Sequence, residues 1–169
     1  RVRLFQQNQL PWTRKILRRV ILRRIPHWIH DFFFGLIMKK PLSYVAEFHE
    51  KFKVPQHHSP VAQLPDSIVE LRHRLMAEEN DEYLEAAKEG NLTEIADALG
   101  DQLYILCGTI LSHGLQHVIE DVFEEIQQSN LSKLDENGEP IFREDGKIMK
   151  SNRYFRPNIA AVLEKHQQG

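Results

Sequence analysis

The sequence predicts an all-α fold: a helical bundle with a four-helix-type core, a basic N-terminal helix and a small C-terminal β-hairpin. Apolar residues recur at steps of three and four along several segments, which is the spacing that lines one face of a helix. Gly90 and Gly114 stand where two of these patterns stop, as glycines do at helix ends. The 169 residues are 41% hydrophobic and 27% charged, which is ordinary for a globular protein with a sizeable core.

Residues 1–30 differ from the rest in composition. Residues 1–40 hold ten Lys or Arg and one acid, Asp31, whereas the remainder holds twelve basic and twenty-three acidic residues. The stretch WTRKILRRVILRRIP places arginines on one helical face and Ile, Leu and Val on another. This is typical of a surface or dimer-contact helix, and contact with a membrane or nucleic acid, or a targeting role, are alternatives. We expect a basic amphipathic extension over 1–30 and a helical domain over 31–169.

The single cysteine and the lack of a long apolar run favour a cytoplasmic protein. One cysteine cannot form an internal disulfide, which suits a reducing compartment. The apolar neighbours of Cys107, such as Leu106 and Ile110, predict that it packs in the core and is not a nucleophile. No apolar run approaches the ~20 residues that a membrane-spanning helix needs.

The first bundle helix is predicted from about Pro41 to Phe52. Residues 53–65 hold three prolines, which predicts a loop, and the pair His57-His58 within it is expected to be solvated rather than to bind a metal.

Two long helices joined by a short turn come next. Ser67 and Glu70 form an S-x-x-E capping box for the first helix, and Gly90 ends it. The second helix begins after Asn91. It is nearly all apolar over 103–111, so we expect that half to be central in the bundle.

The last third of the chain is predicted to hold two shorter helices, over about 116–128 and 158–166. Between them, NGEPIFREDGKIMK contains Asn-Gly and Asp-Gly turns around short strand-like pieces, which predicts the small β-hairpin. We find no internal repeat and no Gly-rich phosphate loop in the sequence.

Carboxylates interrupt the apolar stripe of the helix before Gly90. Ile68, Leu71 and Leu75 begin that stripe at helical spacing. The helical period then carries it into three glutamates: Glu78, Glu79 and Glu82. Like charges packed together repel and tend to protonate unless a cation joins them. A hard divalent cation with oxygen ligands is the simplest partner, and Mg²⁺ is the usual one, with Mn²⁺ as a substitute.

The next helix carries a matching set of acids. Glu94, Asp97 and Asp101 lie within one arc of its surface. Because a short turn makes the two helices antiparallel neighbours, this arc should face Glu78 and Glu82. The sequence therefore predicts a pocket with four or five carboxylates inside a bundle.

Two other interpretations of these acids are open. They could form a solvated face balanced by cations on the same helix, such as Lys88 and Arg72 or Arg74. A carboxylate-bridged di-iron bundle would need a Glu-x-x-His pair on each of two helices, and we find only Glu70 with His73. We favour the Mg²⁺ site, since the glutamates continue the core stripe and their ligands are all oxygen.

Several segments together resemble the all-α nucleoside triphosphate pyrophosphatase superfamily of MazG-type and phosphoribosyl-ATP pyrophosphohydrolase-like proteins. EENDE at 78–82, followed after a spacer by DALGD at 97–101, is similar to that family's E-E-x-x-E and E-x-x-D motifs. SNLSK at 129–133 and NRYFRP at 152–157 resemble the C-terminal phosphate-side segment of the phosphoribosyl-ATP pyrophosphohydrolase-like branch. The resemblance covers about residues 41–166.

The resemblance implies that a nucleoside triphosphate is hydrolysed between its α and β phosphates, as in the house-cleaning of nucleotide pools. We expect Glu79 to orient or deprotonate the attacking water. The expected metal ligands are Glu78, Glu82, Asp97 and Asp101. The expected substrate contacts are Asn130, Lys133, Lys150, Arg153 and Tyr154. Family members are typically dimers or tetramers, so we expect a homodimer or homotetramer.

Two features leave other functions open. Ala98 stands where the family has a glutamate. Glu94 and Asp97 meet the family's E-x-x-D spacing, and Asp97 and Asp101, one helical turn apart, are the alternative; we favour Asp97 as the replacement and Asp101 as the family aspartate. Ala98 also makes a non-catalytic regulator that binds nucleotide or metal plausible, and residues 1–30 would suit a module recruited to a membrane or nucleic acid. Phe48 or His49 could meet the base of the nucleotide, although core packing is the stronger expectation for Phe48.

Overall fold

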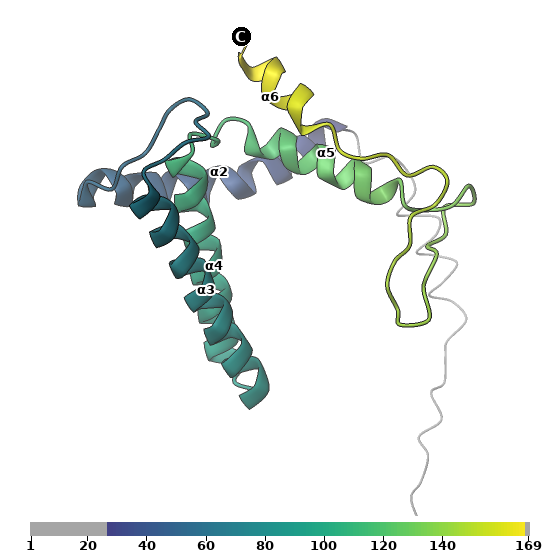
Figure 1. Cartoon of the computed structure of the whole chain (residues 1–169), viewed down its shortest axis with the longest axis horizontal. Helices are drawn as coiled ribbons and strands as arrows, with labels where there is room; N and C mark the ends of the chain where they lie inside the picture. Colours follow the sequence, from purple (N-terminus) through teal and green to yellow (C-terminus); the bar gives the residue numbers. More distant parts are fainter. Residues whose placement is uncertain (1–26, 168–169) are drawn as a thin grey trace, which may run out of the picture. The chain divides into compact units, whose positions relative to one another are not determined.

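The computed structural model describes residues 27–167, so residues 1–26 of the predicted basic extension lie outside the described residues. The described helices are α2 (His27–Phe52), α3 (Asp66–Glu89), α4 (Leu92–Ser112), α5 (Ile119–Leu131) and α6 (Ile159–Gln167) (Figure 1). The prediction of a predominantly helical protein is therefore confirmed over the described residues. No helix within them is long and apolar enough to cross a membrane.

Helix α2 begins earlier than expected and contains Pro41. Proline lacks the N–H that would bond the carbonyl four residues back, which is why it was expected to open the helix and not to lie inside it. Two residues later, the hydroxyl of Ser43 donates to the carbonyl of Lys40 at 2.9 Å. The boundary between two structural units of the chain falls within α2, between Ile37 and Met38.

The α3–α4 pair is held by one tight turn. Gly90 has φ 68°, and its N–H bonds the last carbonyls of α3. Asn91 then caps α4, because its side chain accepts from the N–H groups of Thr93 and Glu94. The capping box predicted at the start of α3 is wrong: Pro65 occupies the cap position and makes no side-chain cap bond, so Ser67 lies inside the helix.

The loop after α2 is fastened to the end of α4. The backbone N–H of His57 donates to Leu111 at 3.0 Å, and that of Val61 donates to His113 at 2.9 Å. The ring nitrogen Nδ1 of His57 lies 2.7 Å from the carbonyl oxygen of Ser112. His57, which was expected to be solvated, therefore anchors the loop, although the residue as a whole is exposed.

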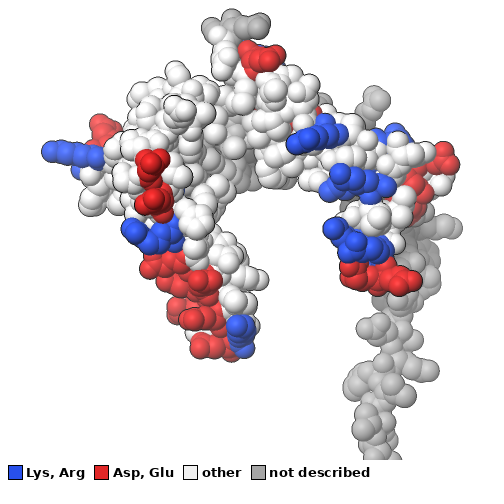
Figure 2. Space-filling model, in the orientation of Figure 1, with Lys and Arg blue, Asp and Glu red and all other residues white. Residues whose placement is uncertain are grey.

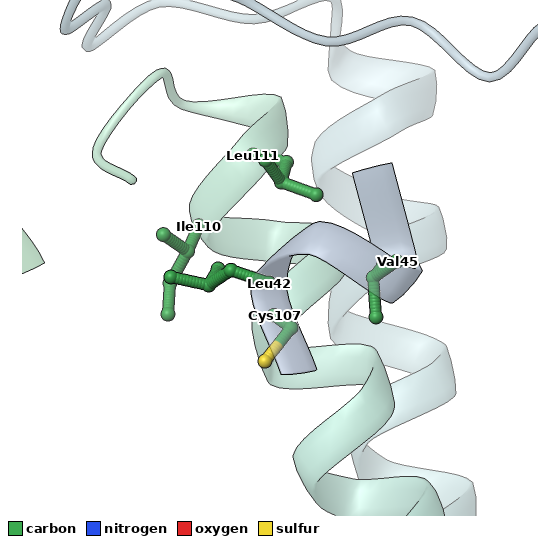
Figure 3. Close-up of a cluster of buried hydrophobic side chains, with 5 residues drawn as sticks. All are labelled: Leu42, Val45, Cys107, Ile110 and Leu111. Atoms are coloured by element: carbon green, nitrogen blue, oxygen red, sulfur yellow. The ribbon is translucent and has the colours of Figure 1, made fainter. Parts of the chain in front are cut away.

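The core lies between α2 and the second half of α4. Its buried members are Leu42, Val45, Cys107, Ile110 and Leu111 (Figure 3). Cys107 is completely buried, and burial raises the pKa of its thiol, which confirms its predicted structural role. The prediction that the second half of α4 is central holds for Cys107, Ile110 and Leu111, whereas Leu103 and Leu106 of the same apolar run are 40% and 44% exposed. A four-helix arrangement around this core stays a prediction.

The predicted C-terminal β-hairpin is not supported. Residues 27–167 contain no strand, and the segment between α5 and α6 has one isolated antiparallel bridge, Phe142 with Ile148. The chain does reverse at Gly146, whose φ is 83°. However, residues 141–150 are all exposed, so no buried face extends the pairing into a ladder.

The segment leading to α6 is tied to α5 by polar contacts. Ser129 is 4% exposed, and its hydroxyl donates to the carbonyl of Phe155 at 2.9 Å. The backbone N–H of Asn158 donates to the carboxylate of Glu125 at 2.7 Å. These contacts hold the residues after the SNLSK segment against the end of α5.

Candidate functional site

The acids of α3 and α4 gather along one side of the helix pair (Figure 2). The side-chain amide of Gln102 donates to the carbonyl of Glu79 at 3.1 Å, and this bond sets the two helices in register. With Glu79 opposite Gln102, the neighbouring Asp101 comes to the level of the glutamates. The antiparallel arrangement predicted from the short turn is thereby confirmed.

Glu79 is the member of this group that departs most from an ordinary carboxyl. Burial raises its pKa above the usual 4.5, and four neighbouring charges raise it further. Those charges are, in decreasing effect, Glu82, Asp101, Glu78 and Asp97. Its Oε2 atom is buried and has no hydrogen-bond partner. The structure therefore brings all five predicted acids into one electrostatic group, with Glu79 at its inner side.

The other four acids are exposed. Among residues 38–167, whose side chains the structure describes, no three His, Cys, Asp or Glu side chains are arranged so that they could hold a metal ion. Their donor set nevertheless fits a hard divalent cation, because all are carboxylates and the orphaned Oε2 of Glu79 lies among them. None of the ion pairs among the described residues includes these acids, which argues against the alternative of an acidic face neutralised by nearby lysines and arginines.

Position 98 is not on the exposed acidic surface. Ala98 is 4% exposed, as is Ala86 on the neighbouring helix at 5%. Small side chains at these positions let two helices approach closely. Asp97 is exposed and precedes Asp101 by about one helical turn. This placement is compatible with Asp97 as the replacement for the missing glutamate.

The residues predicted to contact phosphates lie around the end of α5. The ammonium of Lys133 donates to the side chain of Asn130 at 2.7 Å. Lys150 lies over the ring of Tyr154, with its nitrogen 4.1 Å from the ring centroid. Burial raises the pKa of Tyr154, but hydrogen bonding to Lys150 and Ser129 and the charges of Lys150 and Lys133 outweigh it and lower that pKa overall.

Four of the five predicted substrate contacts are thus brought together: Asn130, Lys133, Lys150 and Tyr154. The fifth, Arg153, reaches instead to the carbonyl of Asp135, at 3.4 Å. No hydrogen bond or ion pair among residues 27–167 joins this basic group to the acids of α3 and α4. The acids of α3 and α4 and the residues around the end of α5 are therefore two groups of side chains without a direct bond between them among the described residues.

The sequence did not reveal a contact between α2, α3 and α4. His49 is 2% exposed, and its Nε2 lies 3.3 Å from a guanidinium nitrogen of Arg72. His49 is therefore not free to contact a base, whereas Phe48, 38% exposed, stacks on Phe52 and meets Tyr104 edge-on. One signal was available: Arg72 precedes Glu79 by seven residues, which places both on the same face of α3.

The sequence profile of the phosphoribosyl-ATP pyrophosphohydrolase family matches residues 45–130, about half of the chain. The match spans all five acids and ends at Asn130, before the lysines of the basic group. No curated protein matches the chain in a sequence search. Pyrophosphohydrolases of this family act on nucleotides and are typically metal-dependent. The chain therefore belongs to the phosphoribosyl-ATP pyrophosphohydrolase family, part of the MazG-like all-α nucleoside triphosphate pyrophosphatase superfamily.

Proposed function

We propose that the protein hydrolyses a nucleoside triphosphate between its α and β phosphates, releasing a monophosphate and pyrophosphate. The observation that carries this proposal is the group of five carboxylates around Glu79. A polyphosphate would add negative charge to a surface that is already acidic, so binding requires cations between the two. We expect Mg²⁺ to serve, with Mn²⁺ as a substitute, which fits the all-oxygen donors.

Glu78, Glu82, Asp97 and Asp101 would hold the metal. A divalent cation supplies charge neutralisation and polarises the phosphoryl oxygens. Glu79 is set apart from these ligands by its partial burial and raised pKa, and a carboxylate with a raised pKa is a better base near neutral pH. In the proposed reaction, water adds to a phosphorus of the α–β anhydride, the bridging P–O bond breaks, and the proton of the water passes to Glu79.

Asn130, Lys133 and Lys150 would contact the phosphates, with Arg153 and Tyr154 beside them. The hydrogen bond from Lys133 to Asn130 and the stacking of Lys150 on Tyr154 support this assignment, because they gather two ammonium groups near one phenol. The SNLSK segment favours the stand-alone branch of the family over a histidine-pathway substrate. We therefore propose nucleotide-pool house-cleaning, in the cytoplasm, as the role.

We also propose that the protein acts as a homodimer or homotetramer. Leu99, Leu103 and Leu106, at 48%, 40% and 44% exposed, form an apolar stripe along α4 that the described residues leave uncovered. These leucines follow one another at steps of four and three, which places them on one face of the helix. A second copy of the chain that packs against α4 would bury them.

The proposal is tested by measuring pyrophosphate release from a panel of nucleoside triphosphates, with Mg²⁺, with Mn²⁺ and with a chelator. We expect metal-dependent release from at least one of them, with the matching monophosphate as the other product. Binding of a nucleotide without any release would favour a regulator, the alternative that Ala98 raised.

Glu82→Ala should lower turnover by at least about 100-fold while the helical content stays unchanged, because it removes a metal ligand and not a core side chain. Glu85→Ala is the matched control, since Glu85 is exposed on the same helix but is not among the charges that raise the pKa of Glu79. A fully active Glu82→Ala enzyme would contradict the metal assignment.

A further inference from the structure

Arg72 is a half-buried cation that has no anionic partner among the described residues. Its Nη2 lies 3.3 Å from His49, its Nε is buried without a hydrogen-bond partner, and no ion pair among residues 38–167, the part of the chain whose side chains are described, includes it. Burial lowers the pKa of this guanidinium. A charge withdrawn from water is costly unless an opposite charge meets it, so an anion is the missing partner.

Gly108 and His49 hold the guanidinium in one place. A Cβ atom added to Gly108 would lie 2.8 Å from Nη1 of Arg72 and 3.1 Å from Nε2 of His49, so only glycine leaves room for this contact. Arginine has donors and no acceptor, so His49 must accept through Nε2 and carry its proton on Nδ1. Burial, and then the charge of Arg72, lower the pKa of His49 and keep it in this neutral form.

This fixed cation lies in line with the acidic group. Arg72 precedes Glu79 by seven residues on α3, and Gly108 follows Asp101 by seven on α4. Two helical turns correspond to about 10 Å along the axis, which an extended nucleoside triphosphate can span. Arg72 is only partly buried, so part of its side chain remains open to solvent.

We propose that Arg72 binds a phosphate group of the nucleotide, with His49 and Gly108 as the residues that position it. The inference rests on the proposed function, since the carboxylates and their metal would hold another part of the same phosphate chain. A guanidinium suits this role because its planar N–H groups match a phosphate with two parallel hydrogen bonds.

The test uses inorganic pyrophosphate as the probe, with a chelator present so that no metal bridges it to the acids. Binding is measured by calorimetry on the full chain and its variants. Arg72→Gln should weaken binding about tenfold or more, because a charge-assisted contact is lost. Arg74→Gln, two residues further along α3 and exposed, is the matched control and should bind within about twofold of the parent.

Gly108→Ala is a second variant that tests the same contact in case Arg72→Gln does not fold. Alanine favours helices, and the atoms it would displace are the far end of the arginine side chain, so it should weaken binding like Arg72→Gln while α4 stays intact. At the positioning residue, His49→Gln keeps an acceptor and should retain more affinity than His49→Leu.

Unchanged pyrophosphate affinity in both Arg72→Gln and Gly108→Ala would overturn the proposal. The proposal would also be wrong if Arg72→Gln kept the pyrophosphate affinity of the parent but caused an oligomer to dissociate. In that case the partner of Arg72 would be a carboxylate of a second copy of the chain. A parent protein that hydrolyses nucleotide but binds no pyrophosphate refutes this inference alone. Loss of pyrophosphate binding in Arg72→Gln from a protein that hydrolyses nothing would refute the proposed reaction and leave the anion site standing.

Discussion

Glu79 and Arg72 lie on the same face of α3 and carry opposite charges, and each lacks a partner of opposite charge among the described side chains. Both are partly removed from water, but Glu79 lies among four other carboxylates while Arg72, among the side chains that are described, contacts a neutral imidazole and no anion. In each case the free-energy cost of burial would fall if a ligand of opposite charge were bound. A metal ion would be the partner of Glu79 and its neighbouring carboxylates, and a phosphate would be the partner of Arg72.

At the residue scale, His49 should make stability depend on pH. Its pKa in the folded protein is lowered from 6.5, first by burial and then by Arg72, so folding disfavours its protonated form. The contribution of neutral His49 to the stability of the fold is thus fully present above about pH 6.5, and it is lost as the pH falls through the lowered pKa. We expect thermal unfolding followed by circular dichroism to show a smaller drop in Tm from pH 8 to pH 5 for His49→Gln than for the parent.

The matched control for this measurement is His58→Gln, which changes an exposed loop histidine. It should reproduce the pH dependence of the parent protein. Equal drops in Tm for the parent and His49→Gln would show that His49 does not resist protonation in the folded state.

At the scale of elements, glycines decide where helices stop and how closely segments approach. Gly90 and Gly114 both have φ 68°, and both end helices where the sequence predicted. They differ in surroundings: a Cβ at Gly90 would meet nothing within 4 Å, whereas one at Gly114 would lie 2.0 Å from the carbonyl oxygen of Ser59. The absence of a side chain at Gly114 therefore also lets the loop that follows α2 pack against the end of α4.

Gly114→Ala should destabilise the protein strongly. Left-handed backbone costs an alanine about 1–2 kcal/mol, and the clash with the backbone of Ser59 adds roughly 1–3 kcal/mol. Gly138→Ala is the control, because Gly138 has φ 79° but open space around it. This variant should lose only the stability that left-handed backbone costs an alanine. Urea unfolding compares the two free energies of unfolding, and equal losses would contradict the close approach of the loop to Gly114.

At the scale of the whole molecule, the described chain leaves apolar surface on α4 that a partner would cover. Leu103→Glu should therefore convert an oligomer into folded monomers, because it places a charge in the middle of the stripe. Sedimentation velocity would measure the change in mass. Val69→Glu is the control, since Val69 is 48% exposed on α3 and lies outside the α4 stripe. This variant should keep the mass of the parent.

A Leu103→Glu variant that keeps the mass of the parent would show that α4 is not the interface. Agreement of both variants with expectation would locate the contact on α4. It would also explain why leucines at core-type spacing are exposed in a single copy.

Helices and their ends were largely predictable because the signals are local. Gly90 and Asn91 acted as expected, and so did the part of the apolar run of α4 that ends in Ile110 and Leu111, whereas Leu103 and Leu106 of that run are exposed. Prediction failed where a local signal met a competing contact or lacked support. Pro41 lies inside α2, Pro65 displaced the capping box of α3, and the turn at Gly146 gained no strands because its side chains find no buried face.

The sequence by itself determined that the protein is helical and that five carboxylates share one side of a helix pair. Helical period and a short turn are properties of neighbouring residues, so they can be predicted without a structure. Only the tertiary structure decided that His49 and Gly108 hold Arg72, and that Lys150 meets Tyr154 beside Lys133. Contacts between distant segments depend on how whole helices and loops pack, and no local pattern in the chain encodes that packing.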